Sequence, residues 1–182
     1  LAVQKLSEWQ KQGKNELYIS VNISAKDFYY MDVYKTITTL VEKYGIIPKT
    51  LKLEITETAI MTGISGELEI LEQFRNYGFQ VEIDDFGSGY SSLNTLKDMD
   101  VDVLKIDMGF LRTTKSDRIQ RSMSILNNII DLSKTLGLSV ITEGVETKEQ
   151  VTALTKMGCR IYQGYYFSKP IPIEEFENTY LK

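Results

Sequence analysis

The chain has 182 residues, of which 42% are hydrophobic and 25% charged, and its formal net charge is −4. This composition is ordinary for a globular protein and excludes a disordered or collagen-like class, while the length predicts one domain with a sizeable core. The acidic balance argues against sequence-independent binding to DNA, because that mode depends on a surplus of Lys and Arg.

Missing residue types narrow the chemistry further. Cys159 is the only cysteine, which excludes an intrachain disulfide, and the absence of His excludes zinc-hydrolase and His-based triad chemistry. Any metal must therefore be held by oxygen ligands. No apolar run reaches the roughly 18 residues of a membrane span, so we expect a cytoplasmic protein without a membrane segment.

Helical patterns alternate with β-rich runs along the chain. The first helical pattern begins at Leu1 without a capping signal, so we expect the chain to be part of a longer protein. Five glycines end a helical pattern just before a β-rich run, where the left-handed backbone of a helix stop is needed. Strands that alternate with single helices in this way are predicted to be parallel. The six predicted strands are residues 17–24, 51–56, 80–86, 103–107, 139–143 and 160–167.

The clearest predicted helix covers residues 117–136, where apolar residues recur at helical spacing along one broad stripe. Thr147 and Gln150 have the spacing of a capping box, and Ser65 is a candidate N-cap for the helix that ends before Gly78. A further short helix is expected at residues 92–97. These signals place a helix between most pairs of consecutive strands.

Six strand-helix units fit two architectures. A closed (β/α) barrel uses eight units, so two would be missing, whereas an open doubly wound sheet could hold six without loss. Polar side chains in the later part of all six strands favour the barrel, because an open sheet serves its ligand from only some strands. We therefore predict an incomplete TIM-type (β/α) barrel, in one domain over residues 1–182. The polar residues are Asn22, Glu54, Asp84, Asp85, Lys105, Asp107, Glu143 and Gln163.

Alternation within the strands places these polar residues on the inner face. Glu54 lies opposite Leu53 on its strand, and Lys105 shares a face with Asp107. Carboxylates that converge in a small volume repel one another, and a divalent cation would neutralise them. Oxygen ligands favour magnesium, manganese or calcium. The alternative is a set of ordinary ion pairs, with Lys105 offsetting Asp84 or Asp107.

Three further features allow two interpretations each. Glu57 and Glu82 could be metal ligands or structural acceptors of backbone N–H groups. The segment 87–89, which reads Gly-Ser-Gly, could bring backbone N–H groups close to a phosphate or form a plain turn. An aromatic group near the C-terminus could stack on a nucleobase or belong to the core. Its members are Tyr162, Tyr165, Tyr166 and Phe167.

Six short segments carry polar residues in a characteristic order. They are Val21-Asn22-Ile23-Ser24, Leu53-Glu54-Ile55-Thr56-Glu57, Asp84-Asp85-Phe86-Gly87-Ser88-Gly89-Tyr90, Lys105-Ile106-Asp107, Thr142-Glu143-Gly144-Val145-Glu146 and Tyr162-Gln163-Gly164. Together they resemble the motif series of EAL-domain cyclic di-GMP phosphodiesterases, in order and over nearly the whole chain. A six-part series in register is far more specific than any of its members.

The resemblance implies a barrel that binds cyclic di-GMP at its C-terminal mouth and hydrolyses it to linear pGpG with two Mg²⁺ or Mn²⁺ ions. Ca²⁺ is expected as an inhibitor. The implied metal ligands are Asn22, Glu54, Asp84 and Asp85, and the implied catalytic residues are Lys105 beside the nucleophilic water, Glu143 as general base, and Asp85. The residues implied to bind substrate or to anchor the loop after Asp85 are Glu57, Asp107, Glu146, Gln163, Gly87, Ser88 and Gly89.

One departure from the family pattern affects the expected activity. The tripeptide Glu-Ala-Leu, whose Glu is a metal ligand in the family, does not occur in the 182 residues. We therefore expect the first strand-helix unit and most of the second to be absent, and the chain alone to be inactive or weakly active. Unpaired strand edges, or dimerising helices, predict a homo-oligomer. The alternative functions are a non-catalytic cyclic di-GMP receptor and a protein-interaction module.

Overall fold

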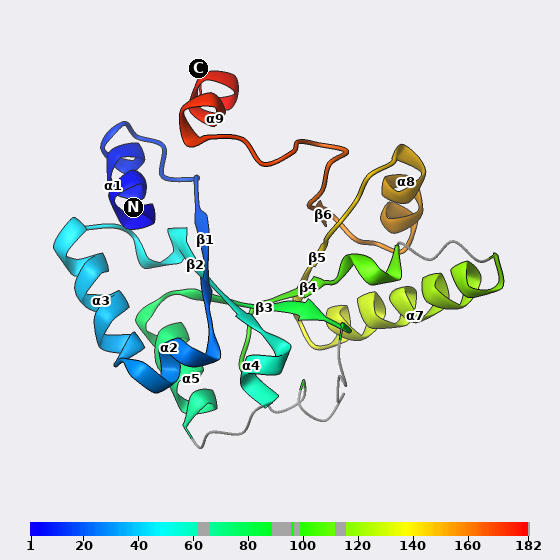
Figure 1. Ribbon diagram of the computed structural model, residues 1–182, viewed down its shortest axis with the longest axis horizontal. Helices are drawn as coiled ribbons and strands as arrows, with labels where there is room; N and C mark the ends of the chain where they lie inside the picture. Colours follow the sequence, from blue (N-terminus) through cyan, green and yellow to red (C-terminus); the bar gives the residue numbers. More distant parts are fainter. Residues whose placement is uncertain (62–65, 89–95, 97–98, 112–115, 182) are drawn as a thin grey trace.

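A single curved sheet of six parallel strands organises the molecule (Figure 1). The computed structural model describes residues 1–61, 66–88, 96, 99–111 and 116–181. Each strand pairs with the next one along the chain, in the order β1-β2-β3-β4-β5-β6. The strands are β1 (Ile19–Ile23), β2 (Leu51–Thr56), β3 (Gln80–Phe86), β4 (Val103–Ile106), β5 (Ser139–Thr142) and β6 (Ile161–Tyr162).

This strand order decides between the two predicted architectures. A doubly wound sheet reverses its order at a switch point, whereas a (β/α) barrel adds each strand to the same edge. No reversal occurs among the six described strands, so the predicted TIM-type fold class is confirmed. The sheet ends at β1 on one side and at β6 on the other (Figure 1).

Helices cover the outer face of the sheet (Figure 1). The long helix α7 agrees with the sequence prediction to within one residue at each end, and its Leu126 and Ile130 are buried. The helices are α1 (Ala2–Lys11), α2 (Ala25–Tyr30), α3 (Val33–Tyr44), α4 (Glu57–Met61), α5 (Glu67–Tyr77), α7 (Ser116–Thr135), α8 (Lys148–Lys156) and α9 (Ile173–Tyr180). Short 3-10 turns η1 (Pro48–Thr50) and η2 (Met108–Phe110) precede β2 and follow β4.

Local sequence signals explain several of these boundaries. Helix α3 is followed by its C-cap Gly45, whose φ of 63° places it in the left-handed conformation that a helix stop needs. Helix α8 is preceded by its N-cap Thr147, whose hydroxyl accepts from the Gln150 backbone N–H while the Gln150 side chain accepts from the Thr147 backbone N–H, as the capping-box spacing predicted. The candidate cap Ser65 and most of the predicted 92–97 helix lie outside the described residues.

The alternation predicted for β2 is present, although both faces of this strand are buried. Leu51, Leu53 and Ile55 are at most 2% exposed. Lys52 and Glu54, at 8% and 9% exposed, occupy the opposite face. Because helices cover one side and the curved sheet encloses the other, the polar face of the strand is also shielded from water.

Strand β6 is shorter than the predicted 160–167 run, because the chain turns after it. The Val145 N–H donates to the Gln163 carbonyl at 3.1 Å, and the Tyr166 N–H donates to the Val145 carbonyl at 3.0 Å. These bonds tie the segment to the loop that follows β5 instead of extending the sheet. Residues 163–167 therefore form a turn, although they include the strand-favouring residues Tyr165, Tyr166 and Phe167.

The C-terminal helix α9 lies near α1, the first helix of the chain (Figure 1). The Trp9 indole N–H donates to Glu177 at 2.7 Å, and Lys5 forms an ion pair with the same carboxylate at 3.3 Å. The Lys14 ammonium donates to the Leu181 carbonyl at 2.8 Å. No helix in the described part of the chain is both long and apolar enough to cross a membrane.

Candidate functional site

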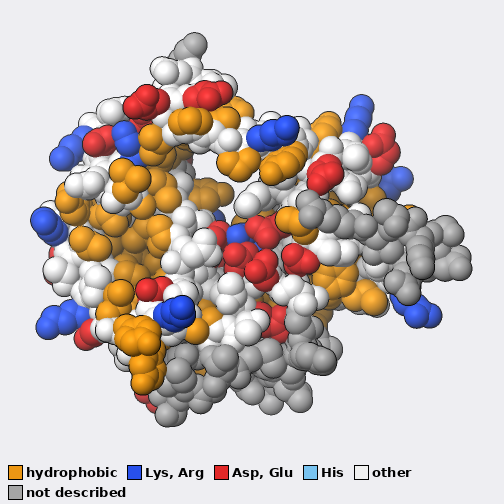
Figure 2. Space-filling view, in the orientation of Figure 1, with side chains coloured by type: hydrophobic (Ala, Val, Ile, Leu, Met, Phe, Trp, Pro, Cys, Tyr) orange, Lys and Arg blue, Asp and Glu red, His pale blue; other side chains and the backbone are white. Residues whose placement is uncertain are grey.

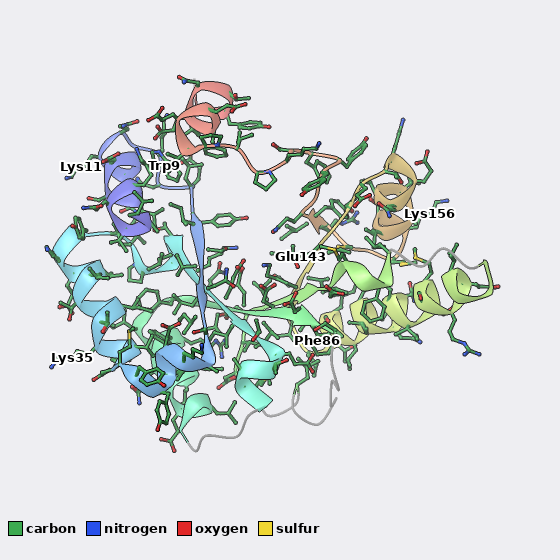
Figure 3. All side chains as sticks on the ribbon, viewed as in Figure 1. Trp9, Lys11, Lys35, Phe86, Glu143 and Lys156 are labelled. Carbon is green, nitrogen blue, oxygen red and sulfur yellow. The ribbon has the colours of Figure 1, made fainter. Side chains whose placement is uncertain are left out.

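Lys105 on β4 is the centre of a buried charged cluster. Its ammonium nitrogen lies 2.7 Å from Glu54, 2.9 Å from Asp84 and 3.0 Å from Glu143. The Lys105 side chain is only 3% exposed, and the three carboxylate side chains are 11 to 14% exposed. Glu143 lies near the middle of the molecule, among side chains that project from the strands (Figure 3).

The four members of this cluster come from four successive strands or their ends. Glu54 is on β2, Asp84 on β3 and Lys105 on β4, and Glu143 directly follows β5. Asn22 is the Cα partner of Glu54 in the β1–β2 register and is exposed. Parallel strands in this register bring residues that are far apart in sequence to one rim of the sheet.

The cluster holds more negative charge than one lysine neutralises. Burial opposes the charge of Lys105, but Glu54, Asp84 and Glu143 outweigh it and hold the pKa of Lys105 well above its ordinary range. Burial raises the pKa of Glu143; Lys105 acts against this rise, whereas Asp84 and Glu54 add to it. For Asp85, burial again raises the pKa first, followed by the charges of Asp84 and Asp107. The raised pKa values of these two acids therefore reflect burial first and the charge of neighbouring carboxylates second.

Three of the acids could hold a divalent cation together. One carboxylate oxygen each of Asp84, Asp85 and Glu143 lies within 4.8 Å of the others. The Asp84 Oδ1 atom is buried and lies 2.9 Å from the Lys105 ammonium. The three carboxylates around this single lysine leave an excess of negative charge, which suits a cation with oxygen ligands. Acidic atoms gather around basic atoms near the middle of the face in Figure 2.

Asp85 has an unusual backbone for its residue type. Its φ of 55° makes it the single described non-glycine residue with a positive φ. Backbone strain of this kind costs roughly 1–3 kcal/mol and persists only where the surroundings impose it. The conformation turns Asp85 away from the regular strand alternation, so that it joins Asp84 beside Glu143 instead of facing the helices.

The start of the loop after Asp85 is held by Glu57. Glu57 begins α4, is 4% exposed, and accepts a hydrogen bond from the Gly87 backbone N–H at 3.3 Å. The Ser88 N–H donates to the Asp85 carbonyl at 3.0 Å, which closes a tight turn. Gly89 lies outside the described residues. Glu57 therefore accepts a backbone N–H, which is one of the two interpretations that the sequence left open.

Asp107 and Glu82 make contacts outside the Lys105 cluster. Asp107 accepts from the Gly109 backbone N–H at 2.7 Å and caps η2. Glu82 pairs with Lys52 at 3.0 Å, and both side chains are buried. The sequence did not single out Lys52, because nothing local in β2 indicates which strand carries its partner.

A pocket of about 350 Å³ adjoins the cluster through Glu143. Glu146 and Gln163, both exposed, line it together with Gly144 and Gly164. Sequence reasoning missed several other lining residues, because three separate loops assemble the pocket and no local pattern marks them. These residues are Met108, Ser168, Lys169 and Pro170.

The C-terminal aromatic group does not form a buried core in the described structure. Tyr165, Tyr166 and Phe167 are 60%, 43% and 52% exposed. Tyr162 is half-buried and stacks on Phe167 with the ring centroids 6.1 Å apart, while its hydroxyl donates to the Cys159 carbonyl. Tyr165 also lines the 350 Å³ pocket, so this ring is available to a ligand there.

Fold and site together define a TIM-type α/β protein with a crowded acidic rim at the carboxyl ends of its strands. Residues 1–170 match the family model described as EAL domain. The chain therefore belongs to the EAL domain family, and the resemblance seen in its motifs is confirmed.

Curated relatives agree with this assignment. The signaling protein YkoW of Bacillus subtilis is 38% identical over 172 residues, which are 93% of this chain and 21% of YkoW. The bifunctional diguanylate cyclase/cyclic di-GMP phosphodiesterase MucR of Pseudomonas aeruginosa is 36% identical over 174 residues, which are 96% of this chain and 25% of MucR. The chain thus spans between 21% and 25% of the length of these two relatives.

Solved structures show the same fold. The MucR phosphodiesterase in complex with cyclic di-GMP superposes with a TM-score of 0.87 at 36% identity, covering 96% of this chain and 70% of that one. BlrP1 of Klebsiella pneumoniae, solved with manganese and cyclic di-GMP, gives a TM-score of 0.81 at 27% identity and covers 92% of this chain and 43% of that one. BlrP1 has also been solved with calcium and cyclic di-GMP.

Proposed function

We propose that this chain forms the catalytic part of a cyclic di-GMP phosphodiesterase, a hydrolase that converts cyclic di-GMP to linear pGpG. The observation that carries the proposal is the buried cluster in which Glu54, Asp84 and Glu143 surround Lys105. An acidic cluster of this kind is costly to bury without function. The cyclic di-GMP complex of the similar MucR domain supports the choice of substrate.

Asn22, Glu54, Asp84 and Asp85 are the proposed ligands of two Mg²⁺ or Mn²⁺ ions. The donors are amide and carboxylate oxygens, which these cations prefer. For Asp84 and Asp85 the assignment is supported by their carboxylate oxygens, which lie within 4.8 Å of each other and of Glu143. When bound, such ions supply a water of lowered pKa and stabilise charge on the phosphoryl oxygens. Ca²⁺, which takes more ligands at longer distances, is proposed to bind and inhibit.

Lys105 is proposed to stabilise negative charge on the reacting phosphate, and Glu143 is proposed to act as the general base. Lys105 keeps its proton because of its raised pKa, so it offers a fixed positive charge beside the reacting phosphate. Glu143 lies 3.0 Å from Lys105 and has a raised pKa, which makes its carboxylate a stronger base for the proton of the attacking water. Both are held by strands of the sheet, so neither needs to reorganise during the reaction.

Substrate contacts and loop anchoring are assigned to residues around this cluster. Glu146 and Gln163 line the adjoining pocket and are proposed to contact the dinucleotide. Glu57, through its bond to Gly87, is proposed to anchor the loop after Asp85. Asp107, which caps η2 beside this pocket, is proposed to hold Met108 in the wall. Ser88, in the turn after Asp85, and Gly89 are proposed to approach the phosphate through their backbone N–H groups.

Product formation tests the proposal directly. The complete domain of which this chain is expected to be part is incubated with cyclic di-GMP and Mn²⁺, and pGpG is measured by chromatography. We expect Asp84→Asn and Glu54→Gln to reduce turnover by about 100-fold or more, because each removes a proposed metal ligand. Asp131→Asn, a matched change on the exposed side of α7, should leave turnover unchanged. Normal rates in both site variants would refute the assigned roles.

A second candidate function is that of a receptor that binds cyclic di-GMP without hydrolysing it. Low turnover by the chain alone stays a prediction. Calorimetry that shows binding without product would support the receptor. A protein-interaction module without ligand affinity is ranked last, because it gives no role to the buried acids. The cytoplasmic location and the single-domain extent over residues 1–182 remain predictions.

A further inference from the structure

A second buried ion pair lies on the same inner face as the Lys105 cluster. Lys52 on β2 and Glu82 on β3 are 3.0 Å apart, and their side chains are 10% and 1% exposed. Ser20 on β1 donates to the other Glu82 oxygen at 3.3 Å, and the Lys52 ammonium lies 3.8 Å from the ring centroid of Tyr18. These contacts keep Lys52 directed toward β3 and β1.

The strand register places this pair directly next to a proposed metal ligand. Lys52 precedes Glu54 by two residues, so both project to the same face about 7 Å apart along the strand. Glu82 is the Cα partner of Glu54 on the neighbouring strand. If Glu82 carried no charge, Glu54 would be the next carboxylate along the face of β2 for the flexible, buried ammonium of Lys52.

We propose that Glu82 is a positioning residue that holds Lys52 away from Glu54 and so keeps Glu54 available to a divalent cation. This inference rests on the metal site of the proposed function and concerns residues that the motif series does not include in that role. The inner face then carries two separated charge groups. One is the neutral Lys52–Glu82 pair, and the other is the Lys105 cluster, whose carboxylates outnumber its single lysine.

Electrostatics gives the direction of the effect. A lysine that pairs with Glu54 adds a second positive charge to a site whose attraction for a cation depends on its excess of carboxylates. Residues that orient metal ligands from behind typically change metal affinity by about 10- to 100-fold when they are mutated. Replacing both members of a buried ion pair by neutral residues is often tolerated, whereas removing one of them is not.

The experiment measures Mn²⁺ binding to the metal-free protein, with the concentration of free Mn²⁺ determined by electron paramagnetic resonance. Circular dichroism confirms that each variant is folded at the temperature of the measurement. We expect Glu82→Gln to weaken Mn²⁺ affinity by about 10- to 100-fold, because it frees Lys52. The double variant K52M/E82Q should return to within about threefold of wild type, since the freed charge is then absent. Asp84→Asn should abolish tight binding in every background.

If Glu82→Gln does not fold, a variant of Lys52 tests the same inference. Lys52→Gln removes the ammonium and leaves Glu82 in place, so Mn²⁺ affinity should stay at or above the wild-type value. A purely structural role for the pair would instead weaken binding in both single variants.

Each outcome decides the inference. Three outcomes overturn the role of Glu82: wild-type Mn²⁺ affinity in E82Q, a loss of affinity that the double variant does not restore, and weakened Mn²⁺ binding in K52Q. In each case Asp84→Asn still tests the metal site. Absence of Mn²⁺ binding by the wild type overturns the metal site and the role of Glu82 together.

Discussion

The ion pairs of Lys105 bear on both interpretations of the acids at the strand ends. The sequence left open whether the acids bind a cation or form ion pairs, and the structure pairs Lys105 with Asp84 and not with Asp107. Because three carboxylates share a single lysine, the ion pairs exist without neutralising the cluster. The ion pair with Asp84 is therefore confirmed, whereas cation binding stays a prediction, which the excess negative charge favours.

The first prediction concerns stability at this residue. Lys105→Met leaves Glu54, Asp84 and Glu143 buried without their shared cation, so the free energy of unfolding should fall by about 3–5 kcal/mol at neutral pH. Urea denaturation measures this loss, and Mn²⁺ should restore part of it. Lys134→Met, at a lysine that is 47% exposed, should change stability by less than about 0.5 kcal/mol. A loss below about 1 kcal/mol for Lys105→Met would contradict the account.

The second prediction concerns the pH dependence of cation binding. Because the pKa of Glu143 is raised above its ordinary 4.5, this acid keeps its proton to a higher pH than a free glutamate. A cation must displace that proton, so Mn²⁺ affinity should fall as the pH decreases through the raised pKa, by up to about tenfold per pH unit. Calorimetric titration at several pH values measures the slope.

Glu143→Gln is the matching variant, because it cannot take up the proton. Its affinity should be lower at neutral pH and should begin to fall only at a lower pH than in the wild type. An unchanged pH profile in this variant would assign the titration to another group, of which Asp85 is the first candidate because its pKa is also raised.

At the level of elements, local patterns predicted the strands well except at the C-terminal end. The 80–86 run and the helix at residues 117–136 are found nearly as predicted. Residues 163–167 form a turn instead of a strand. Their hydrogen bonds to Val145, which lies in the loop after β5, outweigh the strand preference of Tyr and Phe. Propensity is local, whereas these bonds depend on the position of the loop after β5.

The third prediction tests that turn. Gly164 has a φ of 156°, and a Cβ atom there would lie 2.2 Å from the Val145 carbonyl oxygen and 2.4 Å from its nitrogen. Gly164→Ala should therefore destabilise the protein by about 3 kcal/mol and disturb the pocket wall. Gly137 has a φ of 75° and nothing within 4 Å of its Cβ position, so Gly137→Ala should cost only about 1–2 kcal/mol, from backbone strain alone. Equal losses in thermal denaturation would contradict the role of the close contact.

At the scale of the whole molecule, the six strands form a sheet with two ends. β1 pairs only with β2, and β6 only with β5, among the described strands. Edges of this kind present backbone N–H and C=O groups that can pair with another chain. The homo-oligomer expected from the sequence stays a prediction, with contact either through these edges or through helices.

The fourth prediction is therefore concentration-dependent association. Sedimentation velocity from low to high micromolar concentration should show a dimer or larger species of increasing fraction. Association through the strand edges should slow hydrogen exchange of the β1 amides, because these amides would then be hydrogen-bonded to another chain. Association through helices should leave their exchange unchanged. A clean monomer at the highest concentration would rule out both.

The sequence by itself determined an α/β fold with parallel strands, the family resemblance and the identity of the polar residues at the strand ends, whereas the strand order of the structure decided for the barrel. These features depend on periodicity, glycine stops and motif order, all of which are local. Only the tertiary structure decided that Lys105 is shared by three acids, that Lys52 pairs with Glu82, and that residues 163–167 turn toward Val145. Each of these contacts joins separate parts of the chain, and their geometry is set by strand register and loop packing, which no local pattern encodes.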